Sequence, residues 1–227
     1  MRIGLLGTGM VGQTLSGALA RIGHNVVIGT RDPEAALSRT EATRPGMEPF
    51  SRWHGANPGV SVETFSDAAA HGEIVVNATA GTASLDALRA AGQDNLDGKV
   101  LIDVANPLDF SAGFPPTLSV ANTDSLAEQI QRAYPGARVV KALNTVTASV
   151  MVDPQGLGGG EHDVFLSGDD AGAKDEVGRL LREWFGWQRV IDLGDISTAR
   201  GTEMYLALWV RLMAATGSAA FNIRVVR

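Results

Sequence analysis

The stretch Ile-Gly-Leu-Leu-Gly-Thr-Gly-Met-Val-Gly at residues 3–12 decides the fold. Its first half is apolar and predicts a short strand over residues 3–6. Gly7, Gly9 and Gly12 follow that strand directly and match the pattern G-x-G-x-x-G. Apolar residues then recur every three or four positions as far as Ile22, which predicts a helix over residues 10–22.

In this strand–turn–helix setting each glycine has a physical role. The first permits the tight turn, the second lets the main chain approach a diphosphate, and the third lets the helix pack closely on the strand. Amides at the beginning of the helix can then hold the phosphates of a dinucleotide without a cationic side chain. We expect the cofactor-binding turn to consist of Gly7, Thr8, Gly9, Met10, Val11 and Gly12. A plain glycine-rich turn is the alternative interpretation.

The end of the second predicted strand, residues 25–28, indicates which dinucleotide the chain prefers. An NAD-binding chain would have an Asp or Glu at this position, which accepts hydrogen bonds from the ribose 2′-hydroxyl. The chain instead has Thr30 and Arg31, a hydroxyl and a guanidinium that suit a phosphate dianion, so we expect NADP over NAD. Asp32 precedes Pro33 and Glu34, which is typical of a helix N-cap, and we favour that role over ribose binding.

Short aliphatic runs continue along the whole chain and alternate with helical patterns. Several of these runs are apolar throughout, as expected for strands that helices cover on both faces. The predicted strands are residues 3–6, 25–28, 60–65, 74–78, 100–104, 138–143, 164–167 and 189–193. We therefore predict an α/β fold, a doubly wound and mostly parallel Rossmann-type sheet with a short C-terminal helical extension. The expected division is a dinucleotide-binding domain over residues 1–196 and a C-terminal helix and tail over residues 197–227.

Two further loops lie where a doubly wound sheet binds its ligand, at the carboxyl ends of its strands. The loop after the fourth strand contributes Ala78, Thr79, Ala80 and Gly81 as candidate cofactor contacts. Asn106 and Pro107, after the fifth strand, are the others. The alternative is ordinary turn chemistry. Two long stretches rich in Pro and Gly, residues 44–59 and 106–122, are further candidate site-lining loops.

Composition excludes several classes of protein. The chain has 227 residues, of which 44% are hydrophobic and 19% charged, which fits one globular unit. The net charge of −6 opposes binding to nucleic acid or to an anionic membrane surface, and no apolar stretch reaches the length of a membrane span. We expect a cytoplasmic location. The sequence has no cysteine, and its four histidines are widely spaced, so we expect no thiolate chemistry and no metal site.

The sequence also lacks the proton-transfer groups of common dehydrogenases. Tyr134 and Tyr205 are not followed by lysine four residues later, and too few residues follow the last strand for a helical substrate domain. Lys141 stands at a strand end, where a solvated or salt-bridged role is favoured. We predict no catalytic side chain. Direct hydride transfer between two stacked rings requires mainly proximity and orientation, because the cofactors carry the chemistry.

The sequence resembles the deazaflavin-dependent NADP oxidoreductases, which exchange hydride between NADP and coenzyme F420. The segments that carry the resemblance are residues 5–9, 27–31, 142–146, 167–170 and 196–203. The resemblance implies a homodimer with NADP on the glycine loop, Thr8 near the nicotinamide, and the deazaflavin packed over it. It further implies a second, substrate-binding pocket lined by Asn144, Thr145, Ser197, Thr198 and Arg200.

The chain departs from the family pattern at two places. Thr30-Arg31-Asp32 stands where the family has Ser-Arg-Arg, so one cation for the 2′-phosphate is missing. Asn144 stands where archaeal members have histidine, and this Asn-Thr pair also resembles the NADP domains of membrane ferric reductases, whose acceptor is an ordinary flavin. The alternatives are therefore an NADPH-dependent flavin or small-carbonyl reductase, and a non-catalytic NADP-binding sensor. The final helix is apolar nearly all round, which suggests a dimer interface or a core helix.

Overall fold

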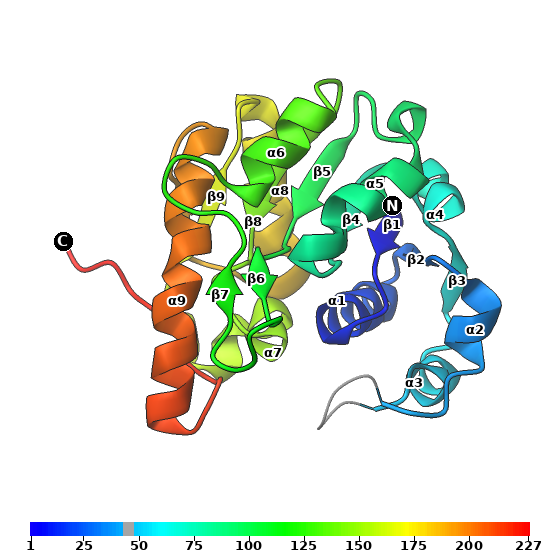
Figure 1. The fold of residues 1–227 in the computed structure, drawn as a ribbon, viewed down its shortest axis with the longest axis horizontal. Helices are drawn as coiled ribbons and strands as arrows, with labels where there is room; N and C mark the ends of the chain where they lie inside the picture. Colours follow the sequence, from blue (N-terminus) through cyan, green and yellow to red (C-terminus); the bar gives the residue numbers. More distant parts are fainter. Residues whose placement is uncertain (43–47) are drawn as a thin grey trace.

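The computed structural model describes residues 1–42 and 48–227. Within them, one eight-stranded sheet has the order β10-β9-β8-β5-β4-β1-β2-β3 (Figure 1). Its strands are β1 (Arg2–Leu6), β2 (Asn25–Thr30), β3 (Val60–Thr64), β4 (Ile74–Asn77), β5 (Val100–Asp103), β8 (Arg138–Ala142), β9 (Val164–Ser167) and β10 (Val190–Asp192). These are the eight strands that the aliphatic runs predict, with ends shifted by at most two residues. The α/β fold with a mostly parallel sheet is confirmed.

The direction of the strands places the loops that matter at one edge. Strands β1 to β5 and β8 are parallel, whereas β9 pairs antiparallel with β8, and β10 runs parallel to β9. The carboxyl ends of β1, β4, β5 and β8 therefore meet at the same edge of the sheet. In a doubly wound fold this edge binds the ligand.

Helices cover both faces of the sheet and bury a separate apolar cluster on each. Along β4, Ile74 and Val76 belong to one cluster and Val75 to the other, which explains why the strand is apolar at every position. The first face carries α1 (Met10–Arg21), α7 (Ala148–Val152) and α8 (Ala171–Phe185). The second carries α4 (Phe65–His71), α5 (Ser84–Ala91), α6 (Leu126–Ala133) and α9 (Ala199–Thr216).

The ends of three helices show how the chain begins and ends them, and the cap at Asp32 is the one that the sequence predicts. Asp32 accepts a hydrogen bond from the amide of Ala35, so α2 (Pro33–Leu37) begins at the proline as expected. Ser125 accepts from the amide of Glu128 at the beginning of α6. Gly186, with φ of +78°, ends α8 in a left-handed turn that favours glycine.

The two long stretches expected to be loops contain structure. Helix α3 (Phe50–Ala56) lies in the first, and residues 44–47 of that stretch are outside the described residues. A small antiparallel hairpin, β6 (Leu108–Asp109) and β7 (Thr117–Leu118), lies in the second. Two-residue strands are too short for an alternating pattern to reveal them. Among the described residues, no helix is long and apolar enough to cross a bilayer.

Candidate functional site

The glycine turn between β1 and α1 leaves the beginning of α1 accessible. Gly7 has φ of +113°, a conformation that favours glycine, and a Cβ at Gly12 would overlap with the carbonyl oxygen of Gly7. A Cβ at Gly9, the N-cap of α1, would meet no atom within 4 Å. Since Gly9 has no side chain to accept from the first amides of α1, these donors are available to a ligand. Thr8, Met10 and Val11 are all at least partly exposed in this turn.

The loop after β4 contacts both the glycine turn and the loop after β5. A Cβ on Gly7 would lie 2.7 Å from the carbonyl oxygen of Ala78, and one on Gly81 would overlap with the carbonyl oxygen of Asn106. Thr79 is fixed by its hydroxyl, which donates to Asn77 Oδ1 over 2.7 Å. The structure thus brings together the three loops that the sequence assigns to the cofactor: residues 7–12, 78–81 and 106–107.

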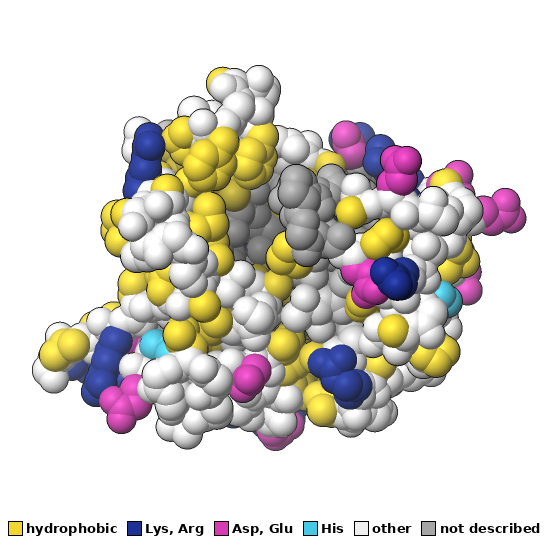
Figure 2. Space-filling model, turned by 90° about the horizontal axis from the view of Figure 1, so that it is seen from below, with side chains coloured by type: hydrophobic (Ala, Val, Ile, Leu, Met, Phe, Trp, Pro, Cys, Tyr) yellow, Lys and Arg dark blue, Asp and Glu magenta, His cyan; other side chains and the backbone are white. Residues whose placement is uncertain are grey.

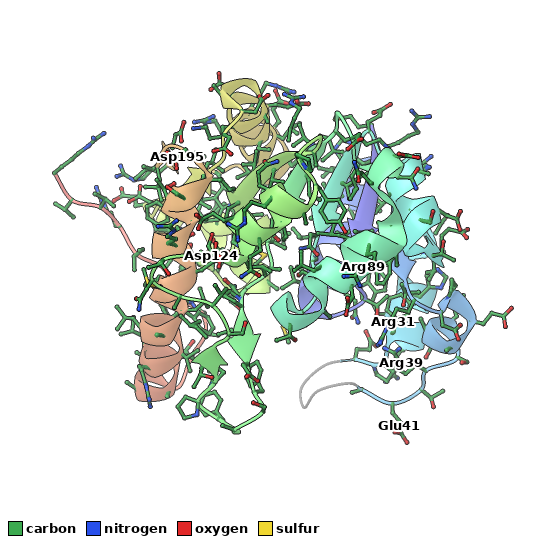
Figure 3. All side chains as sticks on the ribbon, turned by 45° about the horizontal axis from the view of Figure 1, so that its top comes forward. Arg31, Arg39, Glu41, Arg89, Asp124 and Asp195 are labelled. Carbon is green, nitrogen blue, oxygen red and sulfur yellow. The ribbon has the colours of Figure 1, made fainter. Side chains whose placement is uncertain are left out.

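At the end of β2 the two ribose-side residues differ in exposure. Thr30 is buried, and Arg31 is exposed and makes no ion pair with any described residue. Asp32 caps α2, so its carboxylate is engaged by the helix. Arg39 also has no ion pair within the described part of the chain, and Figure 3 shows it on the same flank as Arg31. Sequence reasoning missed Arg39, because it follows Arg31 by eight residues, outside the local pattern.

Asn144, after β8, ties the cofactor-side loops to the last helix. Its Nδ2 donates to Asn106 Oδ1 over 3.0 Å and to the carbonyl oxygen of Thr202 over 3.1 Å. Asn106 Nδ2 in turn donates to the carbonyl oxygen of Asn144 over 2.8 Å. Asn144 is 3% exposed, and its carboxamide nitrogen is engaged by these two acceptors.

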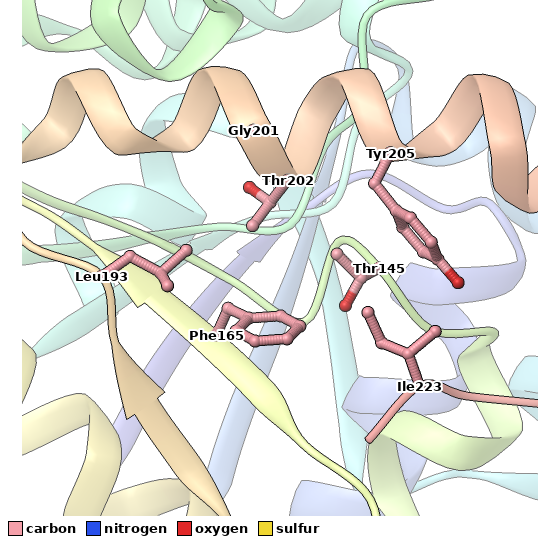
Figure 4. A pocket seen from close by; sticks show the side chains of 7 residues that line it. All are labelled: Thr145, Phe165, Leu193, Gly201, Thr202, Tyr205 and Ile223. Carbon is pink, nitrogen blue, oxygen red and sulfur yellow. The ribbon is translucent and has the colours of Figure 1, made fainter. Parts of the chain in front are cut away.

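The next residue, Thr145, lines a cavity of about 250 Å³ between α9 and β9. The other lining residues are Phe165, Leu193, Gly201, Thr202, Tyr205 and Ile223 (Figure 4). Thr145 is 2% exposed, yet its Oγ1 has no hydrogen-bond partner, and the hydroxyl of Tyr205 is also buried without one. Burial raises the pKa of Tyr205. The cavity is therefore mainly apolar and contains hydroxyl groups that lack partners.

The other residues expected in the second pocket have partners of their own. Ser197 Oγ donates to Asp195, and Thr198 Oγ1 donates to Ser167 Oγ over 2.7 Å. Arg200 forms a two-bonded ion pair with Glu128, and this hydrogen bonding raises the pKa of Arg200. Of the five expected pocket residues, Thr145 is the one that lines the cavity.

Lys141 is salt-bridged, as favoured, and it is also completely buried. Its Nζ lies 2.8 Å from Asp103 Oδ2 and 2.8 Å from Glu203 Oε1, and all three side chains are at most 1% exposed. Burial opposes the charge, but the attraction of both carboxylates outweighs it and raises the pKa of Lys141. The signal that could have revealed Glu203 is a lone carboxylate within the apolar part of the final helix.

Figure 2 shows hydrophobic side chains gathered along one side of a hollow on the face of the molecule seen from below. No group of acidic residues or histidines among the described residues could hold a metal ion.

A glycine turn with accessible helix amides, flanked by two loops at the carboxyl edge of a parallel sheet, defines a nicotinamide-nucleotide-binding protein of the Rossmann class.

Comparison with known proteins identifies the family. A model described as "NADP oxidoreductase coenzyme F420-dependent" matches residues 2–107. The F420-dependent NADP reductase of Methanothermobacter marburgensis is 31% identical over 216 residues, which cover 93% of this chain and 92% of that protein. The chain belongs to the family of coenzyme F420-dependent NADP oxidoreductases.

Two further similarities bear on the site. A crystal structure from Arthrobacter sp. FB24, of a proposed F420-dependent NADP reductase, has 58% sequence identity and a TM-score of 0.95 and covers the whole of both chains. The metalloreductase STEAP3 of Rattus norvegicus is 27% identical over 202 residues. These residues are 89% of this chain, and the chain spans 36% of that protein.

Proposed function

We propose that this enzyme transfers a hydride directly between NADP(H) and a deazaflavin of the coenzyme F420 type. The observation that carries the proposal is the beginning of α1, where unsatisfied amides face open space beside Gly9. With NADPH as donor, the balanced reaction is NADPH + F420 + H⁺ → NADP⁺ + reduced F420. The hydride moves with its electron pair, and the proton comes from solvent.

The residues of the three cofactor-side loops fit NADP. The amides of residues 9–12 would hold the diphosphate, and Thr30 and Arg31 would hold the 2′-phosphate. Arg39 supports this assignment as a second cation, because it compensates for the acid at position 32. Thr8, Thr79 and Asn106 would contact the nicotinamide half, since their loops adjoin at the carboxyl edge.

The cavity under α9 is our candidate for the acceptor pocket. It begins one residue beyond Asn144, which itself contacts the cofactor-side loop at Asn106. Its apolar walls suit a flat ring, and Thr145 Oγ1 offers a hydrogen bond to a ring substituent. No side chain need supply a proton to the ring carbon that receives the hydride, because the nicotinamide and deazaflavin carry that chemistry.

Absorbance spectroscopy tests the proposal directly. Enzyme, NADPH and F420 are mixed, and the loss of the deazaflavin absorbance band is followed; the expected result is turnover with NADPH well above that with NADH. Thr145→Val should raise the F420 KM several-fold and leave the Kd for NADPH unchanged. Absence of turnover with F420 would overturn the proposal.

The same assay with other acceptors distinguishes the alternatives. Reduction of FMN, FAD or a small carbonyl compound, without reduction of F420, would identify a flavin or carbonyl reductase. The similarity to STEAP3 is the observation that favours testing flavins. Tight NADPH binding with no acceptor reduced would identify a sensor.

We further propose that two copies of the chain associate through α9. Leu208 on this helix is 55% exposed, although the helix is apolar nearly all round. A second copy would cover Leu208 and remove the exposed apolar face of the helix from water.

A further inference from the structure

Lys141 is buried at the centre of a polar network that the proposed reaction does not use. Its ammonium group donates to Asp103, to Glu203 and to the carbonyl oxygen of Ala105, so all three of its protons have acceptors. Asp103 is the last residue of β5, and Ala105 directly precedes Asn106 in the cofactor-side loop. Lys141 therefore fixes the beginning of this loop through its bonds to Asp103 and Ala105.

Glu203 connects the same ammonium group to two helices. It belongs to α9, and its carboxylate accepts from the first two amides of α6, at Leu126 over 2.7 Å and at Ala127 over 3.0 Å. One lysine and two carboxylates have a net charge of −1, which the positive end of α6 partly offsets. The network thus joins β5, β8, α6 and α9 at one point.

A second connection runs beside the first. Asn144 donates to the carbonyl oxygen of Thr202, the residue before Glu203, and is paired with Asn106. Two adjacent residues of α9 are therefore fixed to the same loop, one through an ammonium ion and one through a carboxamide. Gly201 and Thr202 of this helix turn line the candidate acceptor cavity. The distance between the cofactor-side loop and the cavity wall is set by these bonds.

Stability alone does not account for an ion triad at this position. Removing three charged groups from water is costly, and apolar side chains of similar volume commonly give an equal or more stable protein. A buried triad with every donor satisfied, in contrast, allows only one arrangement of the elements that it joins. Hydride transfer depends steeply on the distance and orientation of the reacting rings.

We propose that Lys141 is a positioning residue: together with Asp103 and Glu203 it fixes α9 against the loop of residues 105–107, and so aligns donor and acceptor for hydride transfer. Lys141 contacts neither reactant. The inference rests on the proposed function, because it takes the cavity under α9 as the acceptor pocket.

The test compares Lys141→Met with the triple variant D103N/K141M/E203Q. The single variant leaves two carboxylates buried without a cation and is expected to be less stable. The triple variant leaves no buried charge, so its Tm should lie between those of the single variant and the wild type: E203Q removes one of the two oxygens that accept from α6, and K141M removes the donor to the carbonyl oxygen of Ala105. In stopped-flow single turnovers, the triple variant should transfer hydride at least tenfold more slowly, with a Kd for NADPH changed less than twofold. The isotope effect on kcat with C4-deuterated NADPH should rise, because hydride transfer becomes rate-limiting.

Lys99→Met is the control. Lys99, directly before β5, is partly buried and donates to the carbonyl oxygens of Ala69 and Ala70. It lies at the opposite end of β5 from the cofactor-side loop, so its loss should leave the single-turnover rate unchanged. An unchanged rate in the triple variant, or an equal loss in K99M, would overturn the proposal.

Hydrogen exchange separates this proposal from the proposed function. In the triple variant, the amides of Ala105, Asn106 and residues 202–206 should exchange at least tenfold faster, while amides of β1 and β4 keep their protection. If the wild type reduces none of the acceptors, the proposed function fails, and the exchange rates alone decide the positioning role. Unchanged protection at both segments would then reject it.

Discussion

Gly9 and Gly12 lie three residues apart, yet a methyl group added at each would meet different surroundings. At Gly12 it would overlap with the carbonyl oxygen of Gly7, which cannot move without breaking the turn. At Gly9 it would meet open space, and φ of −75° suits alanine. Gly12 therefore serves the packing of α1 on β1, and Gly9 serves the ligand.

Alanine substitutions should separate these two roles. Gly12→Ala should lower the free energy of unfolding by about 3 kcal/mol, the upper range for overpacking a rigid site. Gly9→Ala should lower it by only about 1 kcal/mol, because alanine is a poorer N-cap than glycine, but should raise the Kd for NADPH about tenfold or more, since the methyl group stands where the diphosphate approaches. Urea denaturation and fluorescence titration measure the two quantities. Wild-type affinity in folded G9A would contradict our placement of the diphosphate.

Arg31 makes a second prediction at this scale. Since its guanidinium lacks an ionic partner among the described residues, a 2′-phosphate would be its partner. Arg31→Ala should raise the KM for NADPH about tenfold, the order expected for losing a charge-assisted hydrogen bond, and leave that for NADH almost unchanged. The control is Arg179→Ala on α8, which removes an exposed arginine paired with Glu183. Equal effects of R31A on both nucleotides would mean that the side chain only packs.

The ion pair of Asp124, labelled in Figure 3, with Arg132 makes the free energy of unfolding depend on pH. The side-chain hydrogen bonds from Arg132 lower its pKa from the ordinary 3.8 to about 2. A lowered pKa in the folded state stabilises the protein above pH 3.8, and this contribution disappears as the pH falls towards 2. Asp124→Asn should therefore lower the Tm at pH 7 modestly, because the pair is partly exposed. The difference between variant and wild type should vanish near pH 2; a difference that persists there would contradict this origin.

At the scale of elements, the sequence predicts the features that depend on residues close together along the chain. Strands such as β4 follow from uninterrupted aliphatic runs, and α2 follows from its Asp-Pro-Glu beginning, because burial on two faces and capping leave direct signatures. The reversed direction of β9 and the hairpin β6–β7 depend on partners distant in sequence. The site divides in the same way: the glycine turn has a motif, whereas Arg39, Asp103 and Glu203 acquire their roles only through folding.

The C-terminal tail is an element whose attachment can be tested. Asp163 is fully buried and accepts from Arg189 Nε over 2.7 Å and from the amide of Val225. The tail thereby holds Ile223 in the wall of the cavity. Asp163→Asn should lower the free energy of unfolding by about 1.5 kcal/mol and speed hydrogen exchange in residues 222–227.

The matched control for the tail is Glu161→Gln, which removes the partner of Arg224 in an exposed ion pair. It should change neither quantity measurably. If D163N left the exchange of the tail unchanged, the attachment would have to come from the main-chain bond between Asp163 and Ile223 and from the bonds of Asn222 to His162 and to the carbonyl oxygen of Asp163.

At the scale of the whole molecule, the two faces of the sheet are covered but α9 is covered only on its inner side. Figure 1 shows this helix along one flank of the molecule, with the tail beyond it. Leu206 and Val210 are buried against the sheet, whereas Leu208, between them on the helix, is 55% exposed. Trp209 Nε1 is buried without a hydrogen-bond partner in the same segment.

A dimer through this flank predicts that one charge on α9 separates the copies. Leu208→Asp would place a carboxylate in the apolar contact, where burial without a partner is costly, and should weaken association about a hundredfold or more. Sedimentation at micromolar concentration should give a dimer for the wild type and a monomer for the variant. At low protein concentration the two proteins should have the same Tm. Leu37→Asp on α2, also an exposed leucine, is the control and should remain dimeric. A monomeric wild type would reject the dimer, and a dimeric L208D would mean that the copies meet elsewhere on the surface.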